Sequence, residues 1–305
     1  MKILVTGAAG FIGRHVLTLA IAQGHEVIAW GRHRLVLPGL AGNLPPDFLD
    51  DVGCTDSLEE VEAVIHLAGD YPRFGSPRAR PIELFNANAA LTTKLLDACS
   101  RAGVRRFVLA STAAVYGGRH TTPLSESQAL DAGGAYAASK ACAEMMCRVH
   151  HADDALQTTC LRLFNVFGPG QAGNAIVPSL VRQALEEDPV RVADDRPTCD
   201  FVFVTDVAAA LLAAACTTSR LPDVLNIGSG RGTSIAELGT IVMRAAGRSD
   251  GIHAQNAASA RVTTSIADAG LAATHLGWRA STTLEMGVRT MIDALRAAPT
   301  SRANR

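Results

Sequence analysis

Residues 2–13 read KILVTGAAGFIG, an apolar run followed by glycines at positions 7, 10 and 13. The run from Lys2 to Thr6 predicts a buried strand, and the residues that follow have helical spacing. Gly7 permits a sharp turn, Gly10 lets backbone amides approach a pyrophosphate, and Gly13 lets helix and strand pack closely. Because a helix N-terminus attracts anions, we expect a dinucleotide to bind here, at Gly7, Gly10, Phe11, Ile12 and Gly13.

Outward from this turn, short apolar runs alternate with segments of helical spacing, at residues 27–30, 64–67, 107–110 and 159–163. That alternation is typical of βαβ units, so it predicts an α/β fold with a Rossmann-type, doubly wound parallel sheet. After about residue 165, prolines divide the chain into shorter elements. We expect a dinucleotide-binding domain over 1–164, a smaller C-terminal α/β substrate lobe over 165–296, and a flexible tail over 297–305. Interleaving of the two parts is left open.

Length, charge and cysteine content exclude several classes of protein. The chain has 305 residues, 48% of them hydrophobic, and a net charge of -1, so no basic surface for nucleic acid or anionic lipid stands out. No apolar run reaches the roughly 18 residues of a membrane span. The seven cysteines are scattered without a CxxC pair, which favours reduced thiols in a cytoplasm and no metal site. The expected partner is a small-molecule substrate.

The end of the second expected strand bears on the choice of cofactor. A fold specific for NAD places an acidic residue there, about 20 residues beyond the glycines, to bind the ribose hydroxyls. This sequence instead reads Trp30-Gly31-Arg32-His33-Arg34. Since Arg32 or Arg34 would pair with a 2′-phosphate, the sequence favours NADP(H) over NAD(H). The alternative is that both arginines belong to a solvated loop.

A phenol and an ammonium lie four residues apart in Tyr136-Ala-Ala-Ser-Lys140, so a helix would place them on one face. A nearby cation favours the phenolate, and Tyr136 would then exchange a proton with a carbinol or carbonyl oxygen. The strand at 107–110 ends in Ser111-Thr112, at the sheet edge where such folds bind ligands. We therefore predict a catalytic group of Thr112, Tyr136 and Lys140, with the last two also contacting the cofactor.

With these parts, the chain resembles the extended short-chain dehydrogenase/reductase family, the branch of NAD-dependent epimerases and dehydratases that act mostly on nucleotide sugars. The resemblance implies that Asp51 and Val52 border the adenine. It implies that the cofactor is also lined by Leu67, Ala68, Gly69 and Asn88. Family members commonly form homodimers through two helices, here those that contain Asn88 and Tyr136.

The resemblance also implies a substrate site, with two departures from the family pattern. Asn165 and Asn174 lie where relatives contact the sugar nucleotide. Apart from the resemblance, Tyr71 follows the fourth strand in a loop that either closes over substrate or is an ordinary surface connection. Cys199 stands where relatives place an arginine that binds the substrate diphosphate, and Arg196 and Arg261 are the expected substitutes. Ala113 and Ala114 replace the acid pair of 4,6-dehydratases, which argues against that reaction.

Three functions follow, in order of preference. The first is an NAD(P)-dependent oxidoreductase or epimerase of the extended short-chain type that reduces or epimerises a nucleotide-linked sugar by hydride transfer. The second is an NADPH-dependent reductase of a non-sugar ketone or aldehyde, which Cys199 favours. The third is a non-catalytic NADP-binding regulator, which is disfavoured because Tyr136 and Lys140 are both present.

Overall fold

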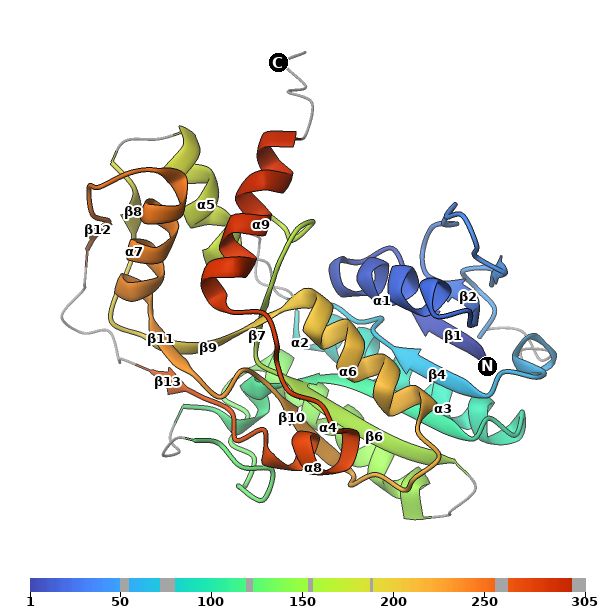
Figure 1. Cartoon of the computed structure of the whole chain (residues 1–305). Helices are drawn as coiled ribbons and strands as arrows, with labels where there is room; N and C mark the ends of the chain where they lie inside the picture. Colours follow the sequence, from blue (N-terminus) through green and yellow to red (C-terminus); the bar gives the residue numbers. More distant parts are fainter. Residues whose placement is uncertain are drawn as a thin grey trace.

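A computed structural model describes residues 1–49, 55–71, 80–118, 123–152, 156–186, 189–255 and 263–297. A larger lobe surrounds a seven-stranded sheet, and a smaller lobe lies beside it (Figure 1). The strands are all parallel and follow the order β10 (Val224–Ile227), β6 (Gln157–Leu163), β5 (Arg106–Thr112), β4 (Ala63–His66), β1 (Lys2–Thr6), β2 (Glu26–Trp30) and β3 (Gly42–Asn43). The predicted Rossmann-type parallel sheet is confirmed.

Helices cover both faces of this sheet because successive side chains of a buried strand point to opposite faces. On one face, Ile3 and Val5 of β1 pack with α1 (Phe11–Ala22) and α6 (Val204–Cys216). On the other, Leu4 packs with α3 (Leu91–Arg101) and α4 (Ala135–Ala152). The short helix α8 (Gly270–Leu276) packs near β10.

A π-helical segment, Asn86–Ala90, joins α2 (Pro81–Phe85) to α3. Such segments carry one extra residue per turn and occur frequently at functional sites. Here the segment buries Asn88, which is 1% exposed, in the layer between α3 and α4. Its polar side chain therefore needs hydrogen-bond partners inside the protein.

The smaller lobe is built around β9 (Thr198–Phe203), which pairs with β7 (Asn165–Phe167), β11 (Gly232–Ser234) and β13 (Thr264–Ser265). A separate pair joins β8 (Arg191–Val192) to β12 (His253–Ala254). Its own hydrophobic core lies among α5 (Ile176–Glu186), α7 (Ile235–Ala246) and α9 (Leu284–Ala297). Short 3-10 helices occur at Asp56–Leu58 and Ala113–Tyr116.

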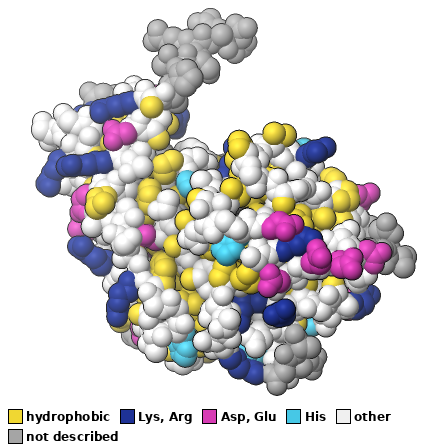
Figure 2. All heavy atoms as spheres, turned by 45° about the vertical axis from the view of Figure 1, so that its right-hand side comes forward, with side chains coloured by type: hydrophobic (Ala, Val, Ile, Leu, Met, Phe, Trp, Pro, Cys, Tyr) yellow, Lys and Arg dark blue, Asp and Glu magenta, His cyan; other side chains and the backbone are white. Residues whose placement is uncertain are grey.

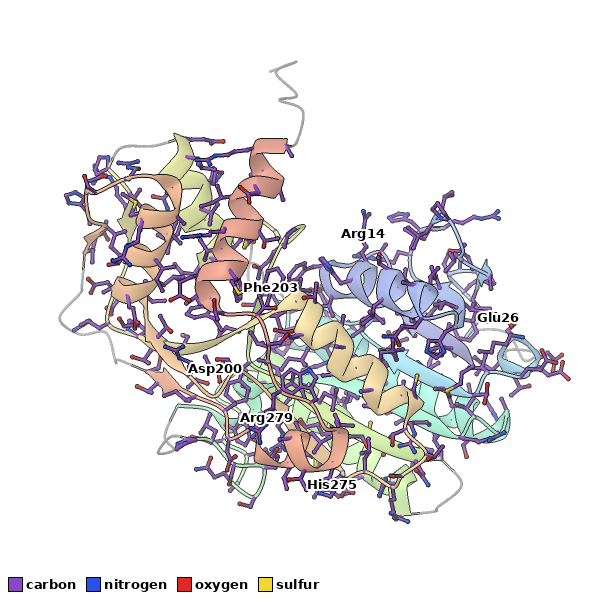
Figure 3. All side chains as sticks on the ribbon, viewed as in Figure 1. Arg14, Glu26, Asp200, Phe203, His275 and Arg279 are labelled. Carbon is purple, nitrogen blue, oxygen red and sulfur yellow. The ribbon has the colours of Figure 1, made fainter. Side chains whose placement is uncertain are left out.

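The two lobes interleave along the chain. It leaves the large sheet after β6, forms β7 to β9, and returns through α6 and β10. Figure 3 shows Phe203, the last residue of β9, at the junction where the chain enters α6. The division into 1–164 and 165–296 stays a prediction. Helix α9 includes Ala297, and residues 298–305 of the expected tail lie outside the described part of the chain.

The surface carries side chains of both charges. On the face in Figure 2, Lys and Arg side chains are scattered, and Asp and Glu side chains gather on the right beside basic ones. This mixture agrees with the net charge of -1. Among the described helices, we find none with both the length and the apolar character needed to cross a bilayer.

Candidate active site

The glycine turn at residues 7–13 has the geometry that its sequence predicts. Gly7 has a φ of +63°, and a Cβ there would lie 2.7 Å from the backbone nitrogen of Ala68. A Cβ on Gly13 would lie 2.4 Å from the carbonyl oxygen of Gly7, so α1 packs directly against the turn. The backbone N–H of Gly10 donates to the same oxygen at 2.9 Å. The turn thus places the end of β1 beside residues 67–69.

The start of α1 suits a bound pyrophosphate. Phe11 and Ile12 lie in its first turn, which contains no acidic side chain. The positive end of the helix dipole is therefore not neutralised from within the helix, as an anion site requires. The residues present fit a dinucleotide.

A chain of buried hydrogen bonds fixes residues 67 and 68 next to this turn. The hydroxyl oxygen of Thr6 accepts from the backbone N–H groups of Leu67 and Ala68, at 3.1 and 3.0 Å. The Thr92 hydroxyl donates to the carbonyl of Asn88, so at 3.0 Å it accepts from Nε2–H of His66, and Nδ1 of His66 accepts from the Thr6 hydroxyl at 2.7 Å. Burial, with a smaller effect from the charge of Lys140, lowers the pKa of His66 to about 3. His66 is therefore neutral at physiological pH.

Asn88 connects the segment that follows to the helix of the predicted catalytic pair. Its Oδ1 accepts from the backbone N–H of Asp70 at 2.9 Å, and its Nδ2 donates to the carbonyl of Asp70 and to Oγ of Ser139 on α4. Gly69 allows this contact, since a Cβ there would lie 2.5 Å from Asn88 Oδ1. These protein partners occupy both ends of the amide, and the cofactor-binding role of Asn88 stays a prediction.

Thr112 and Tyr136 meet at the carboxyl end of β5, close enough for the Thr112 hydroxyl to lower the pKa of Tyr136. The ring of Tyr71 lies edge-on to the ring of Tyr136, with 5.1 Å between centroids. Lys140 lies one helical turn along α4 from Tyr136 and is 6% exposed. The structure therefore brings the three predicted catalytic residues and Tyr71 to one edge of the sheet.

Burial has the largest effect on the pKa values of Tyr136 and Lys140. It raises the pKa of Tyr136 to about 12, against the opposing effect of Thr112. It lowers the pKa of Lys140 to about 8, and the opposing effects come from Cys160, Cys147 and Glu144. The effects on the Tyr136 phenol are burial, Thr112 and Tyr71, and Lys140 is not among them, so the lowering of its pKa by that cation stays a prediction.

The predicted substrate-binding residues are less closely gathered. Asn165 is exposed on β7 and donates through Nδ2 to the carbonyl of Asp200 at 3.2 Å. Asn174 is exposed just before α5. Arg196 donates to both carboxylate oxygens of Asp194, at 2.9 and 2.7 Å, which occupies its bidentate fork. Arg261, Asp51 and Val52 lie outside the described residues.

Sequence reasoning missed the buried charges that hold these parts together. The carboxylate of Asp200 accepts from the backbone of Ser229, Gly230 and Ala267 and from the Ser229 hydroxyl, so it joins β9 to the segments after β10 and β13 (Figure 3). Glu144 forms a buried ion pair with Arg162. One signal was available: Glu144 follows Lys140 by four residues and shares its helix face. The partners of Asp200 lie 29 to 67 residues away, where no local pattern marks them.

The sequence and the fold were compared with those of known proteins. The sequence pattern of the NAD dependent epimerase/dehydratase family matches residues 3–228. UDP-glucose 4-epimerase of Bacillus subtilis (strain 168) is 29% identical over 320 residues, covering 93% of this chain and 94% of that protein. The structure of MoeE5 in complex with UDP-glucuronic acid and NAD has a TM-score of 0.88 at 33% identity, covering 98% of this chain and all of that one. UDP-glucose 4-epimerase of Thermus thermophilus, in complex with NAD, has a TM-score of 0.85 at 28% identity, with coverage of 98% and 100%.

These structures contradict the predicted preference for NADP(H), because both contain NAD, as does MoeE5 with UDP-glucose. Arg32 and Arg34, on which the predicted preference rested, are exposed in the loop after β2. With a matching pattern over well more than half of its length, the chain belongs to the NAD dependent epimerase/dehydratase family.

Proposed function

We propose that this chain is an NAD-dependent epimerase that oxidises and then re-reduces one carbinol carbon of a UDP-linked sugar. The observation that carries the proposal is the approach of Thr112 to Tyr136 at the carboxyl end of β5, with Lys140 one turn along α4. The comparisons support the substrate class, since the B. subtilis relative is a UDP-glucose 4-epimerase and MoeE5 binds UDP-glucuronic acid or UDP-glucose.

Tyr136 is the proton carrier in this proposal. NAD, when bound, supplies an acceptor for the hydride that leaves the carbinol carbon and can return it. As the C–H bond breaks, the oxygen of Tyr136 takes the hydroxyl proton, and it gives that proton back when the carbonyl is reduced from the opposite face. Thr112 donates a hydrogen bond to the substrate oxygen that exchanges this proton with Tyr136. Burial raises the pKa of Tyr136 to about 12, and Thr112 acts in the opposite direction. In this proposal the charge of Lys140 further favours the phenolate when substrate and NAD are bound.

The remaining site residues have assigned roles. The glycine turn and the start of α1, with Phe11 and Ile12, hold the pyrophosphate. Residues 67–69 lie against the cofactor, together with Asn88 behind them. Asn165 and Asn174 bind the nucleotide sugar, and Tyr71 borders the reacting carbon beside Tyr136.

A reductase of a non-sugar ketone is the second candidate. The ion pair with Asp194 engages Arg196, and Cys199 is half-buried. The family resemblance predicts an arginine for the diphosphate at the position of Cys199, so both points favour a substrate without a diphosphate. A screen of UDP-sugars against simple ketones separates the two candidates.

A homodimer is part of the proposal. Four apolar side chains are about half exposed on α2 and α4, which contact one another: Ile82, Phe85, Met145 and Val149. Exposed apolar side chains gathered on neighbouring helices are typical of a subunit interface. Light scattering on the purified protein measures the assembly, and a monomer at all concentrations would refute it. A cytoplasmic location stays a prediction from the cysteine pattern.

The decisive experiment compares Tyr136→Phe with Tyr116→Phe in an epimerisation assay on UDP-glucose and UDP-glucuronic acid, with products separated by chromatography. Both variants lose one phenolic hydroxyl, but Tyr116 donates to Asn226 at 2.7 Å, away from the catalytic group. We expect Tyr136→Phe to lower kcat about 10²- to 10⁴-fold, as loss of general acid–base catalysis does, with NAD binding retained. Near-normal turnover in Tyr136→Phe would remove the residue from the mechanism.

A further inference from the structure

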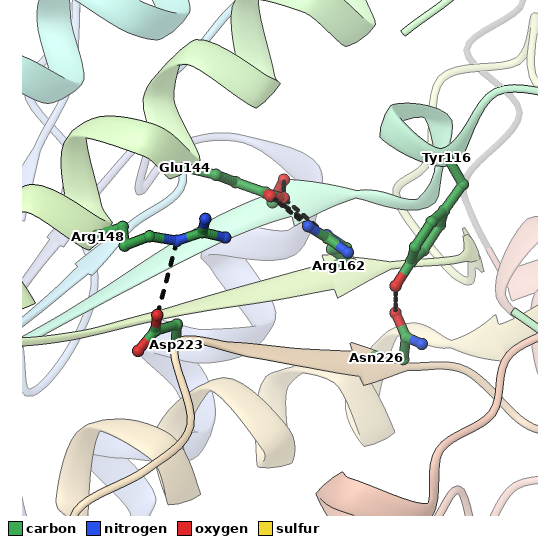
Figure 4. Close-up of polar contacts among 7 residues, drawn as sticks. Tyr116, Glu144, Arg148, Arg162, Asp223 and Asn226 are labelled. Carbon is green, nitrogen blue, oxygen red and sulfur yellow. Dashed lines mark hydrogen bonds and ion pairs between the residues drawn. The ribbon is translucent and has the colours of Figure 1, made fainter. Parts of the chain in front are cut away.

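A buried ion pair lies directly behind the catalytic pair. Arg162 of β6 donates from Nε to Oε1 of Glu144 at 3.0 Å and from Nη2 to Oε2 at 2.7 Å. The two side chains are 2% and 3% exposed (Figure 4). Glu144 follows Lys140 by one turn of α4, so both occupy the same helix face. No role assigned so far uses this pair.

The same carboxylate also reaches the strand that carries Thr112. The hydroxyl of Ser111, the residue before Thr112, donates to Oε1 of Glu144. One side chain on α4 is thus bonded to both neighbouring central strands, β5 and β6. Since Tyr136 and Lys140 lie on α4 and Thr112 ends β5, Glu144 fixes the position of the helix at the point where the catalytic hydroxyls must meet.

The contacts of Glu144 continue through Arg162 to Tyr116 and Asn226, which lie away from the catalytic group (Figure 4). The Arg162 guanidinium carbon lies 4.7 Å from the ring centroid of Tyr116, and Tyr116 donates to Asn226 on β10 (Figure 4). Asn226 donates in turn to the carbonyls of Leu124 and Asp268. This end therefore anchors the edge of the sheet and offers an internal control.

We propose that Glu144 is a positioning residue for the reaction, because its carboxylate holds the helix of Tyr136 and Lys140 in register with the end of β5. The inference rests on the proposed function, since it concerns the same proton transfer. Glu144 touches neither substrate nor cofactor in this role. It acts through the placement of Tyr136 against Thr112 and through its negative charge behind Lys140.

That negative charge has a measurable consequence. Lys140 is surrounded by His66 on β4, Cys160 on β6, and Cys147 and Glu144 on its own helix. Burial lowers its pKa to about 8, and Glu144 acts in the opposite direction. If the reaction requires charged Lys140, kcat falls as the pH rises above about 8. Removing the charge of Glu144 moves that fall to lower pH.

The experiment measures kcat, KM for the UDP-sugar and the pH dependence of kcat in Glu144→Gln, Ser111→Ala and Tyr116→Phe. Glu144→Gln is expected to lower kcat about 10- to 100-fold with KM nearly unchanged, and to shift the alkaline fall of kcat downward. Ser111→Ala keeps both charges and breaks only the link to β5, so it lowers kcat without moving the pH profile. Tyr116→Phe removes a buried hydrogen bond of the same network and keeps normal kcat.

Each outcome decides one point. An unshifted pH profile in a folded Glu144→Gln variant, or equal losses of kcat in Ser111→Ala and Tyr116→Phe, would show a merely structural role and overturn the proposal. If circular dichroism shows that Glu144→Gln does not fold, because Arg162 is left buried without a counter-charge, Ser111→Ala decides the question. Tyr136→Phe, assayed in parallel, separates the two proposals, since normal activity there refutes the proposed function itself.

Discussion

Adding a single methyl group to Gly13 is expected to loosen the cofactor turn. The new Cβ would lie 2.4 Å from the carbonyl oxygen of Gly7 and 2.8 Å from that of Ala8, whereas ordinary contact begins at 3.4 Å. The turn and α1 must therefore separate by about 1 Å, and neither neighbour is a side chain that can rotate away. Overpacking of this kind costs about 1–3 kcal/mol, which for a chain of this length corresponds to a fall in Tm of roughly 1.5–5 °C.

The same displacement moves the start of α1 away from the bound pyrophosphate, so we expect NAD to bind at least about tenfold more weakly, a loss of about 1.4 kcal/mol. Circular dichroism gives Tm with and without NAD, and calorimetric titration gives the affinity. The matched control is Gly251→Ala, where nothing lies within 4 Å of the added Cβ and φ is not positive. If Gly13→Ala melts and binds NAD like the native protein, the close-packing argument for this turn is wrong.

Two further predictions concern stability. His66 has a pKa of about 3 in the folded chain against 6.5 when exposed, so between these values the unfolded state binds more protons and stability falls as the pH falls, by at most about 1.4 kcal/mol per pH unit. Urea unfolding of His66→Gln at a series of pH values should show a shallower dependence, and an identical slope would contradict the assignment. Asp200→Asn replaces a carboxylate that accepts four hydrogen bonds and should lower the unfolding free energy by about 2–4 kcal/mol. The exposed pair of Asp97 and Arg101 provides the control, because Asp97→Asn should change little, and equal losses in the two variants would argue against the role of Asp200.

Local patterns predicted the features that depend on local geometry. The glycine spacing at residues 7–13 fixes a turn within a single strand-to-helix connection, and the spacing of Tyr136 and Lys140 fixes two side chains on one helical turn. The alternation of apolar runs and helical segments was sufficient for the parallel sheet. Each of these depends on neighbours within a few residues, so no knowledge of the packed chain was needed.

Features that depend on residues distant in the sequence could not be predicted from local patterns. Arg32 and Arg34 indicated a phosphate site because sequence shows charge and not which cofactor the folded site accepts, and the rise in the pKa of Tyr136 comes from burial, which sequence spacing does not show. The π-helical segment around Asn88 is likewise set by its contacts with Asp70 and Ser139.

The sequence by itself determined the parallel sheet, the close-packed glycine turn and the placement of Tyr136 and Lys140 one helical turn apart, and it predicted their catalytic role. Only the tertiary structure decided how Thr112 meets Tyr136, how Glu144 is tied to Ser111 and Arg162, and which side chains are buried. The physical reason is that hydrogen bonding and desolvation depend on three-dimensional neighbours, and a chain of this length brings together residues that its sequence keeps far apart.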